Sequence, residues 1–282
     1  MDGIRIYGFA DEASSTLSGQ IDALRRNGMA GLEIRNVDGE NVSDISLEKA
    51  RQVRRQLDAA GLVTWSVGSP IGKIDIVRDD FPAHLDKLRH TLEIAQILRA
   101  ERLRMFSFYI PAGDDPARYR DEVMERLERM AAVAEGTGVM LCHENEKGIY
   151  GDNAERCLDI HRSVKGIAGV FDPANFIQTG QNTAEAWNLL KPYIDYLHVK
   201  DALADGSVVP AGRGIGGVSD ILRDYLARGG RALTLEPHLR VFDGLSGLER
   251  EGERSLTESY AYGSGDEAFD AAAAALREIL RQ

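Results

Sequence analysis

Four side chains that can bind a metal ion or carry a proton each follow a short apolar segment in the second half of the chain: Glu144, Asp172, His198 and Glu236. Three carboxylates and one imidazole form a hard, oxygen-rich donor set. This set suits Mn²⁺, Mg²⁺ or Co²⁺ better than an ion that prefers thiolates, with Zn²⁺ as an alternative. A bound ion would leave positions open for two substrate oxygens and would polarise a carbonyl. The pattern predicts one divalent metal ion, with Mn²⁺ expected first.

Alternation of side chains along a strand tests whether these four residues share a face. Neighbours on their face are Cys142, Val170, Tyr196 and Thr234, and neighbours on the other face are Leu141, Phe171, Leu197 and Leu235. The smaller, mixed set suits the interior of a barrel and the larger apolar set a layer facing helices. A single acidic residue after a strand often only caps the next helix, but four with matching parity favour a site. His143 and Asn145 have the opposite parity and are expected to support Glu144, with Glu146 in the loop beyond.

Eight apolar segments alternate with eight segments of helical periodicity, which is the rhythm of repeated strand–helix units. The predicted strands are 4–9, 31–35, 62–68, 102–108, 138–144, 167–172, 196–200 and 231–236. The predicted helices are 17–28, 46–60, 82–99, 116–136, 153–164, 183–191, 218–228 and 266–281. This order favours a single (β/α)8 TIM barrel over residues 1–282, with a doubly wound open sheet as the alternative. The connection 237–265 is expected to form a lid or wall of the site.

Composition argues against two classes of partner. The formal net charge is −11, which repels nucleic-acid phosphates and anionic lipid surfaces. No apolar stretch approaches the length of a membrane span, and no signal-like segment begins the sequence. Cys142 and Cys157 lack the spacing of a disulfide framework. We therefore expect a cytoplasmic protein without nucleic-acid or membrane partners; its oligomeric state is left open, a homo-oligomer included.

Four stretches carry a resemblance to a known family: CHENEKGIYGD, FDPANF, YLHVKDA and LEPH. They resemble the xylose isomerase-like TIM-barrel superfamily of sugar and sugar-phosphate isomerases and epimerases, in which Glu, Asp, His and Glu follow strands five to eight. The resemblance implies that Glu144, Asp172, His198 and Glu236 bind the metal. It also implies that Glu144 and Glu236 act as acid and base on a small keto-sugar, sugar phosphate or sugar acid, through a metal-stabilised enediolate.

The sequence departs from the 3-epimerase pattern at two positions. Asn175 stands where those enzymes have a histidine, and Ala204 stands where they have an arginine. Arg213 is expected to replace that arginine as a substrate contact. The glycines at 212, 214 and 217 also satisfy a dinucleotide-binding pattern, but they do not open a βαβ unit, so a turn lining the pocket is favoured.

Further candidates each have a structural alternative. Lys200 is expected to reach substrate or to pair with a neighbouring carboxylate, and His238 to line the pocket or lie in solvent. Glu33 is expected to contact substrate or to form an ion pair with Arg35 or Lys73. The three histidines on predicted helices, at positions 84, 90 and 161, are expected at the surface.

Three functions compete with an isomerase or epimerase. An inosose-type dehydratase would use the same metal site and proton abstraction, followed by loss of a hydroxyl. An endonuclease IV-like phosphodiesterase would need more histidine ligands and a cationic DNA track, which six histidines and a net charge of −11 do not readily supply. A non-catalytic sugar-binding barrel would bind ligand without turnover.

Overall fold

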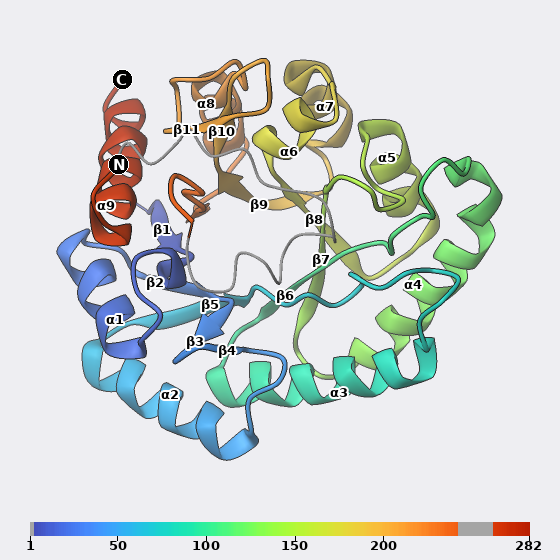
Figure 1. Cartoon of the computed structure of the whole chain (residues 1–282), viewed down its shortest axis with the longest axis horizontal. Helices are drawn as coiled ribbons and strands as arrows, with labels where there is room; N and C mark the ends of the chain where they lie inside the picture. The colour runs from blue at the N-terminus through green and yellow to red at the C-terminus, as the bar shows by residue number, and fades with distance from the viewer. Residues whose placement is uncertain (1–2, 242–261) are drawn as a thin grey trace.

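Eight parallel strands close into a barrel in a computed structural model that describes residues 3–241 and 262–282 (Figure 1). The strands are β1 (Arg5–Gly8), β2 (Gly31–Ile34), β5 (Val63–Val67), β6 (Arg102–Met105), β7 (Met140–Glu144), β8 (Ile167–Phe171), β9 (Ile194–Val199) and β12 (Ala232–Leu235). β1 pairs in parallel with both β2 and β12, so the barrel has no open edge. The predicted (β/α)8 barrel is confirmed, and the open sheet is excluded.

Helices cover the outside of the barrel (Figure 1). They are α1 (Leu17–Arg26), α2 (Leu47–Ala60), α3 (Phe81–Leu98), α4 (Arg120–Ala134), α5 (Ala154–Ser163), α7 (Thr183–Leu190), α8 (Val218–Ala227) and α9 (Gly265–Leu280). Their ends follow local chemistry. Ser46 caps α2 by accepting from the Lys49 amide, and Gly61 ends that helix in the left-handed region at φ 69°. The predicted helix from 116 begins instead as a 3-10 turn, η2 (Pro116–Tyr119), after the Asp115 cap.

Several short elements at the ends of strands were not predicted. They are η1 (Ala10–Glu12), the hairpins β3 (Asn36–Val37) with β4 (Glu40–Asn41) and β10 (Asp201–Ala202) with β11 (Val208–Val209), and α6 (Pro173–Gln178). Two to six residues are too few for a periodic signal, so the sequence reads them as loops. Most of the expected lid at 237–265 lies outside the described residues.

The interior of the barrel and its outer surface carry different side chains, as strand parity predicts. An inner cluster contains Tyr7, Cys142, Val170, Tyr196 and Ala232. The main core between strands and helices contains Leu141, Phe171, Leu197 and Leu235. This separation sets which residues reach the mouth of the barrel. None of the helices in the described ranges has the length and apolar character needed to cross a bilayer.

Candidate active site

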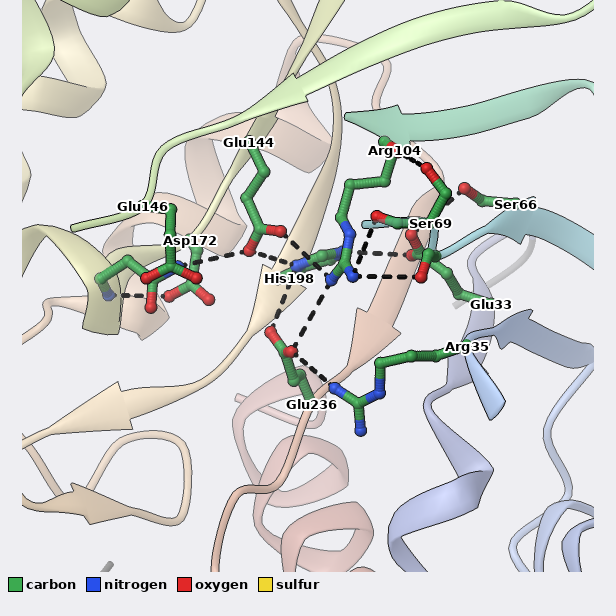
Figure 2. Close-up of polar contacts among 12 residues, drawn as sticks. Glu33, Arg35, Ser66, Ser69, Arg104, Glu144, Glu146, Asp172, His198 and Glu236 are labelled. Atoms are coloured by element: carbon green, nitrogen blue, oxygen red, sulfur yellow. Dashed lines mark hydrogen bonds and ion pairs between the residues drawn. The ribbon is translucent and has the colours of Figure 1, made fainter. Parts of the chain in front are cut away.

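The four predicted ligands converge at the C-terminal ends of consecutive barrel strands (Figure 2). One donor atom from each of Glu144, Asp172, His198 and Glu236 lies within 4.8 Å of the others, and all four residues are buried. They come from the end of β7, the residue after β8, the body of β9 and the residue after β12. Parallel strands bring their carboxyl ends to one rim, so residues remote in sequence meet here.

His198 lies at the centre of this group. Its Nδ1 is 2.9 Å from Glu144 Oε1 and 3.3 Å from Glu236 Oε2, while its Nε2 is 3.1 Å from Glu33 Oε2. Burial favours the neutral ring, but the charges of Glu144 and Glu33 overcome this effect and hold the pKa of His198 well above its ordinary value. Glu144 and Glu236 thus both lie on the Nδ1 side of the imidazole.

Asp172 has two separate roles in this geometry. Its Oδ1 accepts a hydrogen bond from the Asn175 amide and so caps α6. Its Oδ2 is buried and lies 2.8 Å from Lys200 Nζ, yet has no partner of hydrogen-bonding geometry among the described residues. Burial, with the nearby charges of Glu236 and Glu144, raises the pKa of Asp172 to about 7. Asp172 therefore belongs to the group of donors that could hold a metal ion, with Lys200 as the neighbour of its Oδ2.

Lys200 pairs with carboxylates of the site, as one of the two expectations for it stated. Because these carboxylates belong to the donor group, this pairing is compatible with the other expectation, a contact with substrate. Besides Asp172, its ammonium group contacts Glu236 Oε2 at 3.2 Å. Burial alone would raise the pKa of Glu236, but the charge of Lys200 holds it well below its ordinary value. Lys200 keeps Glu236 ionised.

Two buried arginines that the sequence analysis did not select complete the polar cluster (Figure 2). Arg104, on β6, directs Nη1 to Glu144 Oε2 at 3.3 Å and to Glu236 Oε1 at 4.0 Å. Arg35, just beyond β2, donates to Glu236 at 3.2 Å and also pairs with Asp11. The sequence signal that could have selected them is their position, since Arg104 lies within a predicted strand and Arg35 ends one. Arg35 also lies two residues after Glu33, so the two side chains are expected on the same face of the strand.

The charges of this network fit a bound cation. Six buried carboxylates and three buried cationic side chains are linked by ion pairs in the described part of the chain: Asp11, Glu12, Glu33, Glu144, Asp172 and Glu236, with Arg35, Arg104 and Lys200. The carboxylates outnumber the cationic side chains even when His198 carries the proton that its raised pKa indicates. Buried charge is costly unless it is paired. The buried oxygen-rich donors, among them Asp172 Oδ2, and this excess together fit a divalent metal ion.

The two asparagines of the site support the donor residues. Asn145 accepts from the Asp172 amide and donates to the Asp172 carbonyl, both at 3.0 Å, so it fastens the end of β8 to that of β7. Asn175 donates to the Asn145 carbonyl at 2.9 Å and to Glu144 Oε1 at 3.4 Å. Asn175 therefore lies beside the predicted base.

His143 and Glu146 flank Glu144 but differ in environment. His143 is buried on the outer side of β7, where its Nε2 is 2.9 Å from Ser107 Oγ and burial lowers its pKa to about 3. Glu146 lies beyond the strand and pairs with Lys73 at 3.0 Å. As strand parity predicts, Glu144 faces the group of converging donors, whereas His143 points to the outer side of β7.

Two other predicted substrate contacts lie in different places. His238 is 8% exposed, and its Nε2 is 3.4 Å from Glu236 Oε1 and 3.5 Å from Glu12 Oε1, so it belongs to the polar cluster rather than to solvent. Arg213 is exposed and pairs with Glu278 on α9. The structure does not bring Arg213 to the four converging residues.

Glu33 has partners other than the two cations considered from the sequence. Its Oε1 accepts from Tyr196 Oη at 2.8 Å and from Ser66 Oγ at 3.2 Å, and its Oε2 faces His198. The residue is fully buried. It lies inside the barrel, next to the inner aromatic cluster.

The glycine-rich loop after β9 folds around a carboxylate of the chain itself. Asp201 accepts four backbone hydrogen bonds at 2.9 to 3.1 Å, from Ala202, Gly212, Gly214 and Gly216. A Cβ on Gly214 would lie 2.3 Å from the Ala202 carbonyl, and one on Gly216 would lie 2.6 Å from Asp201 Oδ1. These glycines permit close approach to Asp201, and the amides that a phosphate would use are already engaged.

The expectation that the three helix histidines lie at the surface is wrong for His84. That residue is buried, and its Nε2 accepts a 2.7 Å hydrogen bond from the Gly72 amide. Burial lowers its pKa to about 4. His90 and His161 are partly buried. His84 stands at helical spacing from Phe81 and Leu88, both buried, so the apolar periodicity of α3 was the signal that could have placed it on the inner face.

Comparison with known proteins gives a family match and several similar folds. A family model described as xylose isomerase-like TIM barrel matches residues 21–251. A search of curated proteins found no match. Among solved structures, the probable 3-DHS dehydratase AsbF of Bacillus anthracis is 14% identical, with 99% of both chains covered and a TM-score of 0.74.

Two further structures have the same fold. D-psicose 3-epimerase of Clostridium cellulolyticum H10, solved with D-tagatose, is 16% identical over 99% of this chain and 98% of its own, with a TM-score of 0.73. A xylose isomerase-like TIM-barrel protein of Mycobacterium smegmatis, solved with magnesium, is 14% identical over 99% and 97%, with a TM-score of 0.70. At these identities the likeness concerns the fold.

Proposed function

Because the chain belongs to the xylose isomerase-like TIM-barrel family, and because its buried carboxylates and imidazole converge at the mouth of the barrel, we propose that it is a divalent-metal-dependent isomerase or epimerase. Its substrate class is a small keto-sugar, sugar phosphate or sugar acid. The proposed ligands are Glu144, Asp172, His198 and Glu236, and Mn²⁺ is the ion expected first. We propose that the protein acts in the cytoplasm.

The observation that carries this proposal is the placement of two glutamates beside the same imidazole nitrogen. A bound divalent ion would polarise the substrate carbonyl and acidify the neighbouring C–H. Glu144 and Glu236, from strands β7 and β12, are then placed to remove a proton and to return one. Lys200 holds Glu236 ionised, which is the form that can accept a proton, and Arg104 orients Glu144.

The other polar residues surround the position that a substrate would take. Asn175 donates toward Glu144, and His238 lies near Glu236. Hydroxyl and carbonyl oxygens of a sugar are matched by such donors, and we propose that Asn175, Lys200 and His238 contact substrate. Glu33 and Arg213 were also candidates; Glu33 faces Nε2 of His198, and Arg213 is exposed and pairs with Glu278.

Dehydration of an inosose-like or related ketone is the second candidate. It is favoured by the similarity to the probable 3-DHS dehydratase AsbF. The same base would remove the proton, and a β-hydroxyl would leave as water. Both reactions begin with the same abstraction step and differ in the fate of the β-hydroxyl.

The decisive experiment is incubation of Mn²⁺-loaded protein with a panel of keto-sugars and cyclic ketones in D₂O. Isomerisation or epimerisation gives a product that carries deuterium and has lost no water, whereas dehydration gives a product lighter by one water. Glu144→Gln and Glu236→Gln should abolish either reaction. No exchange with any substrate would contradict the proposal and favour a non-catalytic barrel, and cleavage of abasic-site DNA would favour the phosphodiesterase.

A further inference from the structure

We propose that Glu33 is the positioning residue for His198: it holds the Nε2 side of the imidazole so that Nδ1 faces the metal ligands. This inference rests on the metal centre proposed above. It assigns Glu33 neither to the substrate nor to the metal, but to the orientation of one ligand.

The two nitrogens of His198 face different groups (Figure 2). Nδ1 faces Glu144 and Glu236, which belong to the group of converging donors. Nε2 faces Glu33 at 3.1 Å, on the other side of the ring. A carboxylate oxygen only accepts hydrogen bonds, so with a metal ion bound at Nδ1 the Nε2–H group of His198 would donate to Glu33 and be held in place by it.

The surroundings of Glu33 fix its carboxylate in one place. Its Oε1 accepts hydrogen bonds from the hydroxyls of Tyr196 and Ser66. Gly68 packs close to its side chain, since a Cβ on Gly68 would lie 3.4 Å from Glu33 Cγ. These two hydroxyl groups leave Oε2 to the imidazole. A buried carboxylate with three donors around it is satisfied without a substrate.

The ring of His198 is also restrained from the side. The Phe9 ring lies at 5.2 Å with an interplanar angle of 82°, and the Tyr196 ring lies at 5.6 Å with an angle of 62°. Aromatic packing limits the plane of the imidazole, and Glu33 selects which nitrogen points toward the ligands. Carboxylates behind metal-bound histidines typically contribute 10- to 100-fold to metal affinity.

The test measures metal binding without substrate. Apo protein is titrated with Mn²⁺ and Co²⁺ in competition with a chelator, for wild type, Glu33→Gln, Glu33→Ala and Tyr196→Phe. Glutamine keeps one acceptor oxygen for the ring and can turn its amide toward the two hydroxyls. We expect affinity to fall about 10-fold in Glu33→Gln, about 100-fold in Glu33→Ala and less than about 10-fold in Tyr196→Phe. The visible spectrum of bound Co²⁺ should change in the same order.

Asp195→Asn is the matched control. Asp195 is a carboxylate on β9, the strand of His198, but it pairs with Arg102 away from the four ligands. Its affinity and Co²⁺ spectrum should equal those of wild type. If Glu33→Ala does not fold, the isosteric Glu33→Gln decides. Wild-type affinity and an unchanged spectrum in both Glu33 variants would overturn the positioning role, whereas tight metal binding without turnover would overturn only the proposed function.

Discussion

The two halves of the barrel contribute different chemistry to one site. Strands β7, β8, β9 and β12 supply the three carboxylates and the imidazole that can bind a metal ion. The first half, formed by β1, β2, β5 and β6 with the segments after them, supplies arginines and Glu33, which contact those donors, and the Ser66 hydroxyl, which contacts Glu33. The second half therefore provides the donors, and the first half, together with Lys200 of the second, sets their charge and orientation. The predictions below test this division, from the largest expected effect to the smallest.

Removing a donor from the second half should abolish the site. We expect Asp172→Ala and His198→Ala to retain no stoichiometric Mn²⁺ and to lose turnover by about 10³-fold or more, since both carbonyl polarisation and base orientation are lost. Elemental analysis and the D₂O assay check this. Mn²⁺ at 100 times its Kd should stabilise wild type by about 2.7 kcal/mol and these variants not at all. Equal metal content in wild type and both variants would disprove the ligand assignment.

Removing an arginine from the first half should impair catalysis without abolishing metal binding. Arg104→Met should lower kcat/KM by about 100-fold, because Glu144 and Glu236 lose a shared cation. Arg102→Met is the matched control on the same strand, since Arg102 pairs with Asp195 outside the donor group. It should alter kcat/KM less than about twofold and lower the free energy of unfolding by about 1 kcal/mol. Similar kcat/KM values for the two variants would remove the proposed role of the first half.

Acid should lower the free energy of unfolding through His84, a buried histidine in the first half of the barrel. His84 holds the Gly72 amide after β5, and its lowered pKa of about 4 keeps it neutral in the folded protein. The unfolded chain takes up the proton below about pH 6.5, so this contribution is intact above that pH and declines as the pH falls toward 4. The loss amounts to about 1.4 kcal/mol at about pH 5.5.

Urea unfolding near pH 7.5 and near pH 5.5 measures this loss. The decrease in the free energy of unfolding should be smaller by about 1.4 kcal/mol in His84→Gln, because glutamine can accept from Gly72 but does not titrate. An identical pH dependence in wild type and variant would show that His84 is not held neutral.

The smallest effect is expected at Arg213, which lies in neither group of site residues. Its ion pair with Glu278 is exposed on both sides, and exposed pairs contribute about 0 to 1 kcal/mol. Arg213→Ala should change kcat/KM less than about twofold with any substrate found in the panel. A large rise in KM would restore the expectation that Arg213 replaces the missing arginine at position 204.

The sequence predicted one half of the site better than the other for a physical reason. Strand parity places a residue on a face, and the four donors lie at or near the ends of strands in consecutive units, so their convergence follows from barrel closure. Arg102 and Arg104 lie on the same face of β6, and no local sequence pattern distinguishes the buried Arg104 from the partly exposed Arg102. The difference in their burial depends on where along β6 each arginine stands.

The remaining site residues depend on contacts across the barrel. Asp11 and Glu12 lie in a three-residue turn after β1, which carries no periodic signal. Glu33 was selected from its parity, but its partners Tyr196 and His198 are more than 160 residues away in sequence. Such pairings become visible only when the strand order and register are known. The fold, by contrast, required only the alternation of strands and helices.

Glu236 contacts both halves at once: Arg35 and Arg104 from the first, and His198 and Lys200 from the second. Substitutions at these four positions should therefore show epistasis, with double variants departing from the sum of the single effects by about 0.5 to 3 kcal/mol. During evolution, a change of substrate specificity on one side would favour compensating changes on the other. The barrel can be divided by donor chemistry, but its two halves do not vary independently.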